Sequence, residues 1–326
     1  MRNALSLCAA LLLAAPAARA EWVSRTVDGI MGTRIAVELW SDERAAGEAA
    51  IDAVMAEMQR IDTNMSTYKP DSELSRLNAR AARAPVQVSA ELFDLLATSM
   101  EYSRITHGAF DVTYASVGFM YDFRAHHHPT EAQIRQALPA VNYRHVQLDR
   151  AHHTVRYQRP GMRIDLGGIA KGYAVDRGIA ILQARGIRHA LVSAGGDSRV
   201  IGDRFGKPWI IGIRHPDRKD EIVTRLPLVD TAISTSGDYE RYFDENGERY
   251  HHIIDPRTGQ SARAVRSATV LADTALRTDG LSKTAFVLGA EQAIRIYEAL
   301  GDVDAVIVSP DGKVHYTSGL KPADAP

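Results

Sequence analysis

The chain has 326 residues, with 39 Lys and Arg against 40 Asp and Glu, and its formal net charge is −1. This balance, without any basic block, argues against a nucleic-acid partner. The one cysteine, Cys8, lies in an apolar N-terminal stretch. The rest of the chain therefore has no thiol for a disulfide, a metal site or a nucleophile.

The first 20 residues predict an export signal rather than part of the fold. A basic start precedes an apolar core over residues 4–15, and a small-x-small cleavage site ends at Ala20. The core is too short to span a bilayer, and the bulky residue before Cys8 disfavours a lipid anchor there. We expect cleavage after Ala20 and a periplasmic chain with a net charge of −3, because two arginines are lost.

Between residue 21 and about residue 160, the pattern predicts two strands followed by two helices. The strands cover Val23–Val27 and Thr33–Trp40, and the helices cover Glu43–Met65 and Ser89–Thr106. In the loops that follow, His126–His128 cannot all face one metal, so we expect a solvated loop there and a hairpin loop at His152-His153. The Asp71/Ser72 pair and Ser89 are predicted to cap helices.

The stretch Arg163–Asp176, RIDLGGIAKGYAVD, is the most informative part of the chain. It predicts a strand that carries Asp165, a turn through two glycines, and a helix over Ile169–Arg185 with Lys171 in its first turn. The free N–H groups and dipole of such a helix start suit a phosphate. An ordinary strand–helix connection is the alternative, since the spacing is neither GxGxxG nor GxxxxGK[ST].

Beyond this stretch, short strands alternate with helices. Strands are predicted at Ala190–Ala194, Trp209–Arg214, Ile222–Val229, Val265–Ala272, Val303–Val308 and Val314–Tyr316. A hydroxyl-rich turn is predicted at Ile233–Tyr239, and helices at Arg277–Leu288 and Ala290–Leu300. Without an internal repeat or a clear linker, this mixed order predicts one α+β domain over residues 21–326.

Seven short motifs occur in a fixed order along the chain. They are MGT from Met31, MSTYKPDSELSRLN from Met65, GAFDVT from Gly108, IDLGGIAKGYAVD from Ile164, TSGDYERYF from Thr235, HIIDPRTG from His252 and TDGLSKTAFVLG from Thr278. Together they resemble the ApbE family, the FAD:protein FMN transferases, over essentially the whole mature chain. The resemblance implies largely antiparallel sheets flanked by helices.

The resemblance also implies an activity and a set of site residues. Such an enzyme binds FAD and Mg²⁺, moves the FMN half of FAD to a threonine of an acceptor flavoprotein, and releases AMP. It implies FAD contacts at Met31, Tyr68, Ala109, Phe110, Asp111, Asp165, Lys171 and Ile254. It implies metal ligands at the Gly168 carbonyl and at Asp279. His252 matches the histidine proposed to activate the acceptor hydroxyl, and its ordinary pKa of about 6.5 suits a base.

Three alternatives stay open at this stage. Asp111 and Asp165 could be structural caps rather than FAD contacts. FAD could be hydrolysed to FMN and AMP, with water in place of the threonine. The chain could also bind flavin without turnover. An approach to the inner membrane is implied only peripherally, through the acceptor.

Lys283 departs from the family pattern, which has a threonine or serine four residues after Asp279. Helical spacing puts its ammonium near the metal position, and a protonated lysine cannot ligate Mg²⁺. The lysine could swing outward and leave a weak site completed by water, Ser282 or Thr284. Its charge could instead replace part of the metal's charge. We therefore predict weak Mg²⁺ dependence and slow turnover, with Lys283→Thr gaining metal affinity and rate.

Overall fold

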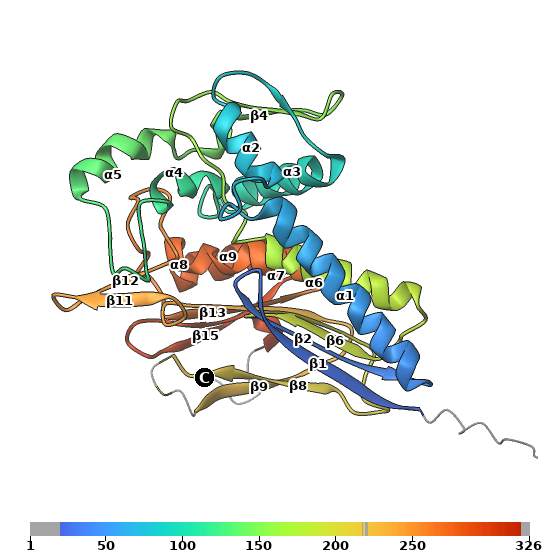
Figure 1. Ribbon diagram of the computed structural model, residues 1–326. Coiled ribbons are helices and arrows are strands. Elements are labelled where there is room, and N and C mark those ends of the chain that lie inside the picture. The colour runs from blue at the N-terminus through green and yellow to red at the C-terminus, as the bar shows by residue number, and fades with distance from the viewer. Residues whose placement is uncertain (1–19, 217, 219–220, 321–326) are drawn as a thin grey trace, which may run out of the picture.

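A large antiparallel sheet forms the base on which most of the helices lie (Figure 1). The computed structural model describes residues 20–216, 218 and 221–320, so the predicted export signal, including Cys8, lies outside the described residues except for Ala20. The strand order is β1-β2-β6-β7-β10-β13-β14-β15, and every neighbouring pair is antiparallel. The prediction of an α+β fold with largely antiparallel sheets is confirmed.

The strands of this sheet come from both halves of the chain. They are β1 (Glu21–Ile30), β2 (Thr33–Ser41), β6 (Ala190–Ala194), β7 (Asp197–Ile201), β10 (Ala232–Gly237), β13 (Ser267–Ala272), β14 (Asp304–Val308) and β15 (Val314–Tyr316). Both faces of the central strands are covered and carry mainly apolar side chains, with Val192 and Val270 among those on the helix-facing side and Val200 and Leu271 among those on the other.

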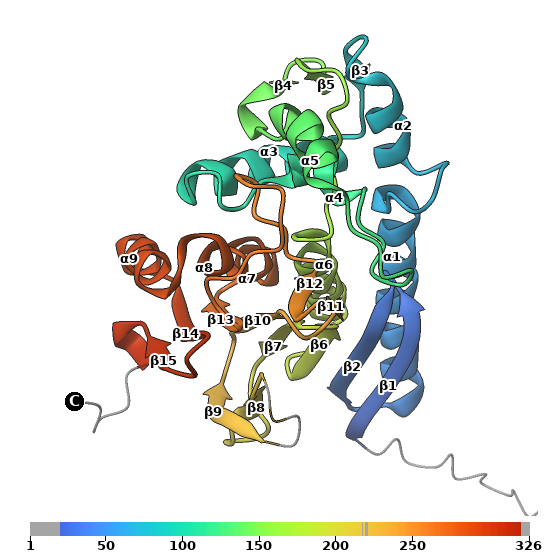
Figure 2. The same cartoon turned by 90° about the vertical axis from the view of Figure 1, so that its left-hand side faces the viewer.

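Helices α1 (Arg44–Met65), α6 (Ala170–Ala184) and α7 (Ala275–Ser282) pack side by side on one face of the sheet (Figures 1 and 2). The predicted apolar face of α1 is confirmed, since Ile51, Val54 and Met58 are fully buried. Helix α6 lies within the predicted Ile169–Arg185. These helices bring segments separated by more than 200 residues into one layer.

The opposite face of the sheet is covered by a β-hairpin. Strands β8 (Trp209–Arg214) and β9 (Ile222–Leu228) pair with each other and not with the main sheet. Trp209 and Leu226 pack against Ile233 and Leu271 of the central strands. Figure 1 shows this hairpin below the sheet and the helices above it.

A mainly helical layer lies above the sheet helices (Figure 2). It contains α2 (Glu73–Arg80), α3 (Ala90–Ile105), α4 (Ala115–Gly118), α5 (Glu131–Ala137), the 3₁₀ turn η1 (Val112–Tyr114), and a small sheet of β3 (Val86–Gln87), β4 (Val146–Asp149) and β5 (Thr154–Tyr157). Ser72 and Ser89 cap α2 and α3 as predicted. Helices α8 (Thr284–Leu288) and α9 (Ala290–Leu300) and the hairpin β11 (Tyr242–Glu245)–β12 (Glu248–His251) complete the chain. No helix among the described residues has the length and apolarity that a membrane span needs.

The predicted histidine loops are confirmed as loops. His126 and His127 are exposed, and His126 and His128 stack on aromatic rings of the β11–β12 hairpin. His152-His153 forms the turn between β4 and β5. Among the described residues, no group of three or more His, Cys, Asp or Glu side chains is arranged to hold a metal ion.

The predicted strand before the central glycines is wrong. Residues 162–166 have no regular secondary structure and belong to no sheet. The Asn78 side-chain amide accepts a hydrogen bond from the Ile164 N–H at 2.8 Å and donates one to the Ile164 carbonyl at 2.8 Å. These are the hydrogen bonds that a neighbouring strand would otherwise make. After these contacts, the chain continues through Asp165 and the glycine turn into α6.

Two further predictions in the C-terminal half are wrong. The hydroxyl-rich stretch Ile233–Tyr239 is not a turn, because most of it is strand β10 in the middle of the sheet. Its hydroxyls are paired across the layer, for example Ser234 with Thr278 at 2.7 Å. The predicted helix Arg277–Leu288 begins earlier, at Ala275, and is divided at Lys283 into α7 and α8.

Candidate active site

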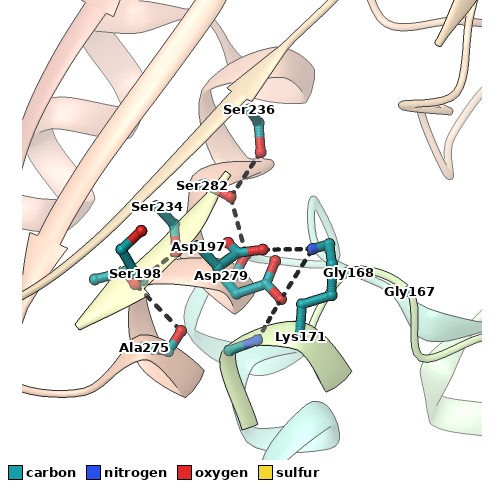
Figure 3. A network of polar contacts seen from close by, with 12 residues as sticks. Gly167, Gly168, Lys171, Asp197, Ser198, Ser234, Ser236, Ala275, Asp279 and Ser282 are labelled. Atoms are coloured by element: carbon teal, nitrogen blue, oxygen red, sulfur yellow. Dashed lines mark hydrogen bonds and ion pairs between the residues drawn. The ribbon is translucent and has the colours of Figure 1, made fainter. Parts of the chain in front are cut away.

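Two lysines and two aspartates form a buried charged cluster where α6, α7 and β7 meet. Figure 3 labels three of them, Lys171, Asp197 and Asp279. The Lys171 ammonium donates to the Asp197 carboxylate at 2.5 Å and lies 3.5 Å from that of Asp279. Lys283 forms an ion pair with the other oxygen of Asp279. The aspartate side chains are almost fully buried, whereas those of Lys171 and Lys283 are 23% and 18% exposed. The site therefore presents positive charge toward solvent, with the carboxylates behind it.

The close approach of α6 and α7 depends on Gly172. A Cβ at this position would lie 2.1 Å from the Ala275 carbonyl oxygen, which no side chain tolerates. The Gly172 N–H instead donates to the Asp279 carboxylate at 3.0 Å. The anion predicted at the start of this helix is thus, in the structure, the protein's own carboxylate, where the helix dipole stabilises it.

The protonation of the cluster follows from burial and charge. Burial acts to raise the pKa of Asp279, but the positive charges of Lys171 and Lys283 outweigh it and the pKa is lowered. Burial raises the pKa of Asp197, as does the negative charge of Asp279. For Lys171, burial acts to lower the pKa, but Asp197 and Asp279 raise it above its ordinary value. Lys171 is therefore a permanent cation at neutral pH.

Hydroxyl groups hold the Asp279 backbone in place. The Ser282 hydroxyl donates to the Asp279 carbonyl at 2.9 Å and pairs with Ser236 of β10 at 2.9 Å (Figure 3). One turn earlier, Thr278 pairs with Ser234. The serines of β10 thus fix the rotation of α7, and this fixes the direction of the Asp279 carboxylate.

A second polar group surrounds Asp165. Its carboxylate accepts hydrogen bonds from the Thr67 hydroxyl at 2.7 Å, the Tyr114 hydroxyl at 3.1 Å and the Gly167 N–H at 2.7 Å. Tyr68, the neighbour of Thr67, is 85% exposed. An aromatic ring held this far out of the core is an available stacking surface.

His251 and His252 have different environments, as their adjacent positions on an extended segment predict. The His251 ring is buried, with Nε2 donating to the Ala262 carbonyl at 2.6 Å and Nδ1 accepting from the Ile253 N–H at 3.3 Å. The Nδ1 atom of His252 is buried and has no hydrogen-bond partner in the described part of the chain. Burial lowers the pKa of His252 to about 3, and the charges of Arg241 and Lys283 act in the same direction. At neutral pH this imidazole is neutral, and a pKa this low makes it a weak base unless negative charge is brought close to it.

The His252 pKa predicts how stability varies with pH. The unfolded chain binds the proton at an ordinary pKa of about 6.5, whereas the folded chain does so only at about 3. Between these values the unfolded state holds more protons, so folding stability is lost as the pH falls from about 6.5 toward 3. We expect His252→Gln to weaken this dependence. Urea unfolding of both proteins from pH 4 to 8 measures it, and parallel stability curves would contradict the assignment.

The other residues that the resemblance assigns to FAD lie in several places. Phe110 borders the cluster, because a Cβ at Gly168 would lie 3.4 Å from its ring. Met31 lies in the β1–β2 turn with a positive φ of 53°. Beside it, the Gly32 carbonyl accepts from Arg241, whose own carbonyl accepts the His252 N–H at 3.1 Å. The turn and the histidine segment are thus neighbours.

Three of the residues assigned to FAD have side chains that are buried in the protein and not exposed to a ligand. Asp111 is 6% exposed, and its carboxylate accepts the N–H groups of Thr113 and Tyr143, each at 2.8 Å, so the cap interpretation describes its contacts. Ala109 and Ile254 are buried in separate apolar clusters. Any contact these two make with a ligand has to use the backbone.

Asp197 was not among the residues singled out from the sequence. The signal was present as an acid directly after the Gly195-Gly196 pair, and its partner Lys171 lies 26 residues earlier. A Cβ at Gly196 would lie 2.4 Å from the Thr235 carbonyl, so this glycine lets β7 start against β10. The pair thus directs Asp197 toward the cluster.

Comparison with known proteins identifies the family. The sequence profile of the ApbE family matches residues 31–307. The chain belongs to the ApbE family. An FAD:protein FMN transferase of Treponema pallidum is 33% identical over 312 residues, covering 89% of this chain and 86% of the relative. One of Haemophilus influenzae is 35% identical over 281 residues, covering 82% and 81%.

Solved ApbE structures have the same fold. The ApbE protein from Thermotoga maritima superposes with a TM-score of 0.85 at 33% identity, covering 92% of this chain and 98% of the other. The flavin transferase ApbE from Vibrio cholerae gives a TM-score of 0.83 at 30% identity, covering 93% and 99%. The ApbE architecture therefore extends over nearly all of the chain.

The oxygens that the ApbE resemblance assigns to a metal ion do not fit one in this structure. The Lys283 ammonium donates to the Gly168 carbonyl at 3.3 Å and to the Asp279 carbonyl at 2.8 Å, and it forms the ion pair with the Asp279 carboxylate. The other carboxylate oxygen of Asp279 accepts from Gly172 and lies beside Lys171. An ammonium thus takes the position that a Mg²⁺ ion needs.

Proposed function

We propose that this chain is an FAD:protein FMN transferase. It transfers the FMN moiety of FAD to a threonine hydroxyl of an acceptor flavoprotein and releases AMP. Membership of the ApbE family supports the reaction class. The observation in the site that carries the proposal is the His252 imidazole, which is neutral at neutral pH, lies near the charges of Arg241 and Lys283, and has an Nδ1 without a hydrogen-bond partner among the residues that the structure describes.

The reaction requires a base and a positively charged surface. The threonine oxygen attacks the phosphorus of the FMN half, a phosphoester bond forms, and the phosphoanhydride bond to AMP breaks with its electron pair leaving on AMP. His252 accepts the hydroxyl proton. Lys171 and Lys283 stabilise the charge that develops on the phosphoryl oxygens. The negative charge of bound FAD raises the proton affinity of His252 when the substrate is present.

The FAD-binding residues of the proposal are those of the family pattern: Met31, Tyr68, Ala109, Phe110, Asp111, Asp165, Lys171 and Ile254. The exposed Tyr68 ring supports a stacking role toward the flavin. The Lys171 side chain is partly exposed, whereas the carboxylates of the charged cluster are buried, and this supports a contact between Lys171 and the diphosphate of FAD. Mg²⁺, the other cofactor of the family pattern, would require Lys283 to move, so no step here is assigned to it.

The reaction is tested by incubating the protein with FAD and a threonine-bearing acceptor, with and without Mg²⁺. A gain of FMN mass on the acceptor, with AMP released, is the expected result. AMP without that mass gain would indicate an FAD pyrophosphatase instead. Unchanged FAD would indicate a flavin-binding protein without turnover.

Asp165 provides a separate test of the FAD site. Asp165→Ala is expected to weaken FAD binding by about 1–3 kcal/mol, because its partner donors lose their acceptor beside the ligand. Titration of FAD against the variant, with a thermal melt, measures this. Asp149→Ala, on the exposed β4–β5 hairpin, is the control and should leave affinity unchanged. Unchanged FAD affinity with a collapsed melting temperature for Asp165→Ala would make Asp165 a structural cap only.

The proposed location is the periplasm, as one domain over residues 21–326 after cleavage at Ala20. The apolar core and small-x-small site of the N-terminus support it. The acceptor would bring the enzyme to the inner membrane only peripherally. Mass spectrometry of the protein from a periplasmic extract tests this, and a chain that retains its first 20 residues would contradict it.

A further inference from the structure

We propose that Lys283 is a built-in cation at the FAD diphosphate, so that this enzyme binds FAD and transfers FMN without a divalent metal ion. The inference rests on the proposed function, since it assigns a role within the same site. Its basis is the set of contacts that the Lys283 ammonium makes.

The ammonium is directed inward by three oxygen atoms. They are the Gly168 carbonyl at 3.3 Å, the Asp279 carbonyl at 2.8 Å and a carboxylate oxygen of Asp279. An ammonium group has three donors and no acceptor, so these contacts use its full capacity. The contact to Gly168 is the longest, and a phosphate oxygen of the ligand can replace it.

The backbone holds this arrangement in place. Lys283 lies at the junction of α7 and α8, four residues after Asp279, and the Asp279 carbonyl is itself fixed by Ser282. Gly168 begins the turn into α6, where a side chain would approach Phe110. Oxygen atoms from two segments, the Gly168 turn and helix α7, therefore converge on one Nζ atom, which a lysine that merely covers the surface does not require.

Charge balance also favours the lysine over a metal ion. Lys171 and Lys283 balance Asp197 and Asp279, so the buried cluster is neutral as it stands. A Mg²⁺ ion added to this set before FAD binds would leave two uncompensated positive charges, and Mg²⁺ requires oxygen ligands at about 2.0–2.1 Å in octahedral geometry. Replacing Lys283 with threonine removes one charge, frees the Asp279 oxygen and supplies a hydroxyl.

The first experiment measures FAD affinity by flavin fluorescence in EDTA and across a Mg²⁺ titration. For the wild-type protein we expect values within about twofold across the titration. For Lys283→Thr we expect FAD binding at least about tenfold weaker in EDTA and restored by Mg²⁺. For Lys283→Met, FAD binding should be weakened by the same factor, and Mg²⁺ should not restore it, because a thioether does not bind Mg²⁺. Lys207→Thr, at an exposed lysine, is the control and should behave as wild type.

The second experiment measures Mg²⁺ binding by calorimetry without FAD, together with transfer to an acceptor. Lys283→Thr should bind Mg²⁺ and the wild type should not. A wild-type FAD affinity that rises tenfold with Mg²⁺, or overlapping titrations for wild type and Lys283→Thr, would overturn the inference. Thermal melts establish that each variant is folded. Metal-independent FAD binding without any transfer would contradict the proposed function and leave the role of Lys283 intact.

Discussion

His252→Ala is expected to lower the rate of FMN transfer by about 10²–10⁴-fold while FAD still binds. This is the usual contribution of a positioned acid–base group. The reason is that the His252 imidazole is neutral at neutral pH and its ring makes no side-chain hydrogen bond within the described residues, so the acceptor hydroxyl loses its proton acceptor when the ring is removed. Single-turnover transfer, with FAD affinity measured on the same protein, separates the chemical step from binding.

His251→Ala is the matched control for this variant. The His251 ring is held between the Ala262 carbonyl and the Ile253 N–H, inside the core beside Phe286. Its loss should reduce the free energy of unfolding by about 1–3 kcal/mol, because buried partners are left without a hydrogen bond. Transfer per folded molecule should stay close to wild type. Equal losses in the two variants would refute the assignment of His252 as the base.

The parts of the fold that sequence predicted well are those decided by local chemistry. Helix α1 has an apolar face with the 3.6-residue period, and this pattern located the helix to within one residue. Ser72 and Ser89 cap their helices with hydrogen bonds to residues three positions later, so both partners are adjacent in sequence. Alternation of apolar residues likewise located β2 to within one residue.

The parts that sequence did not predict depend on distant partners. Strand β10 reads as a polar turn because its serines and threonines favour turns when considered alone. In the fold, the Ser236 hydroxyl forms a hydrogen bond with that of Ser282, 46 residues later, and the Thr235 hydroxyl forms one with that of Thr269. The strand predicted at Ile164 is absent because Asn78, 86 residues earlier, satisfies that backbone. Neither pairing has a local signature.

The candidate site shows the same division. Spacing of four residues predicted that Lys283 could reach the region of Asp279, but its direction was left open. The inward direction depends on the Gly168 carbonyl, which is 115 residues away in sequence. The role of Asp197 was missed for a related reason, since only the folded chain brings it to Lys171. The sequence motifs therefore identified Lys171, Asp279 and Lys283 as site residues, but their ion-pair partners depend on tertiary contacts.

Asp279→Asn is expected to destabilise the protein by about 3–5 kcal/mol, because it removes the charge of a fully buried carboxylate that pairs with two lysines. The asparagine carbonyl can still accept the Gly172 N–H, but its amide then faces the Lys283 ammonium as a second donor. Urea unfolding measures the loss. Glu131→Gln, at a pair with Arg135 whose side chains are 80% and 70% exposed, is the control and should cost at most about 0.5 kcal/mol.

Combining Asp279→Asn with Lys283→Met should recover part of that loss. The double variant removes the ammonium that faces the amide, whereas Lys171 keeps its partner Asp197. We expect a coupling free energy of about 0.5–3 kcal/mol between the two positions in a double-mutant cycle, as for contacting charged residues. Because both variants retain the acceptor for Gly172, the cycle isolates the charge interaction from the packing of α6 on α7. Strictly additive losses would mean that Lys283 does not lie against Asp279 in solution.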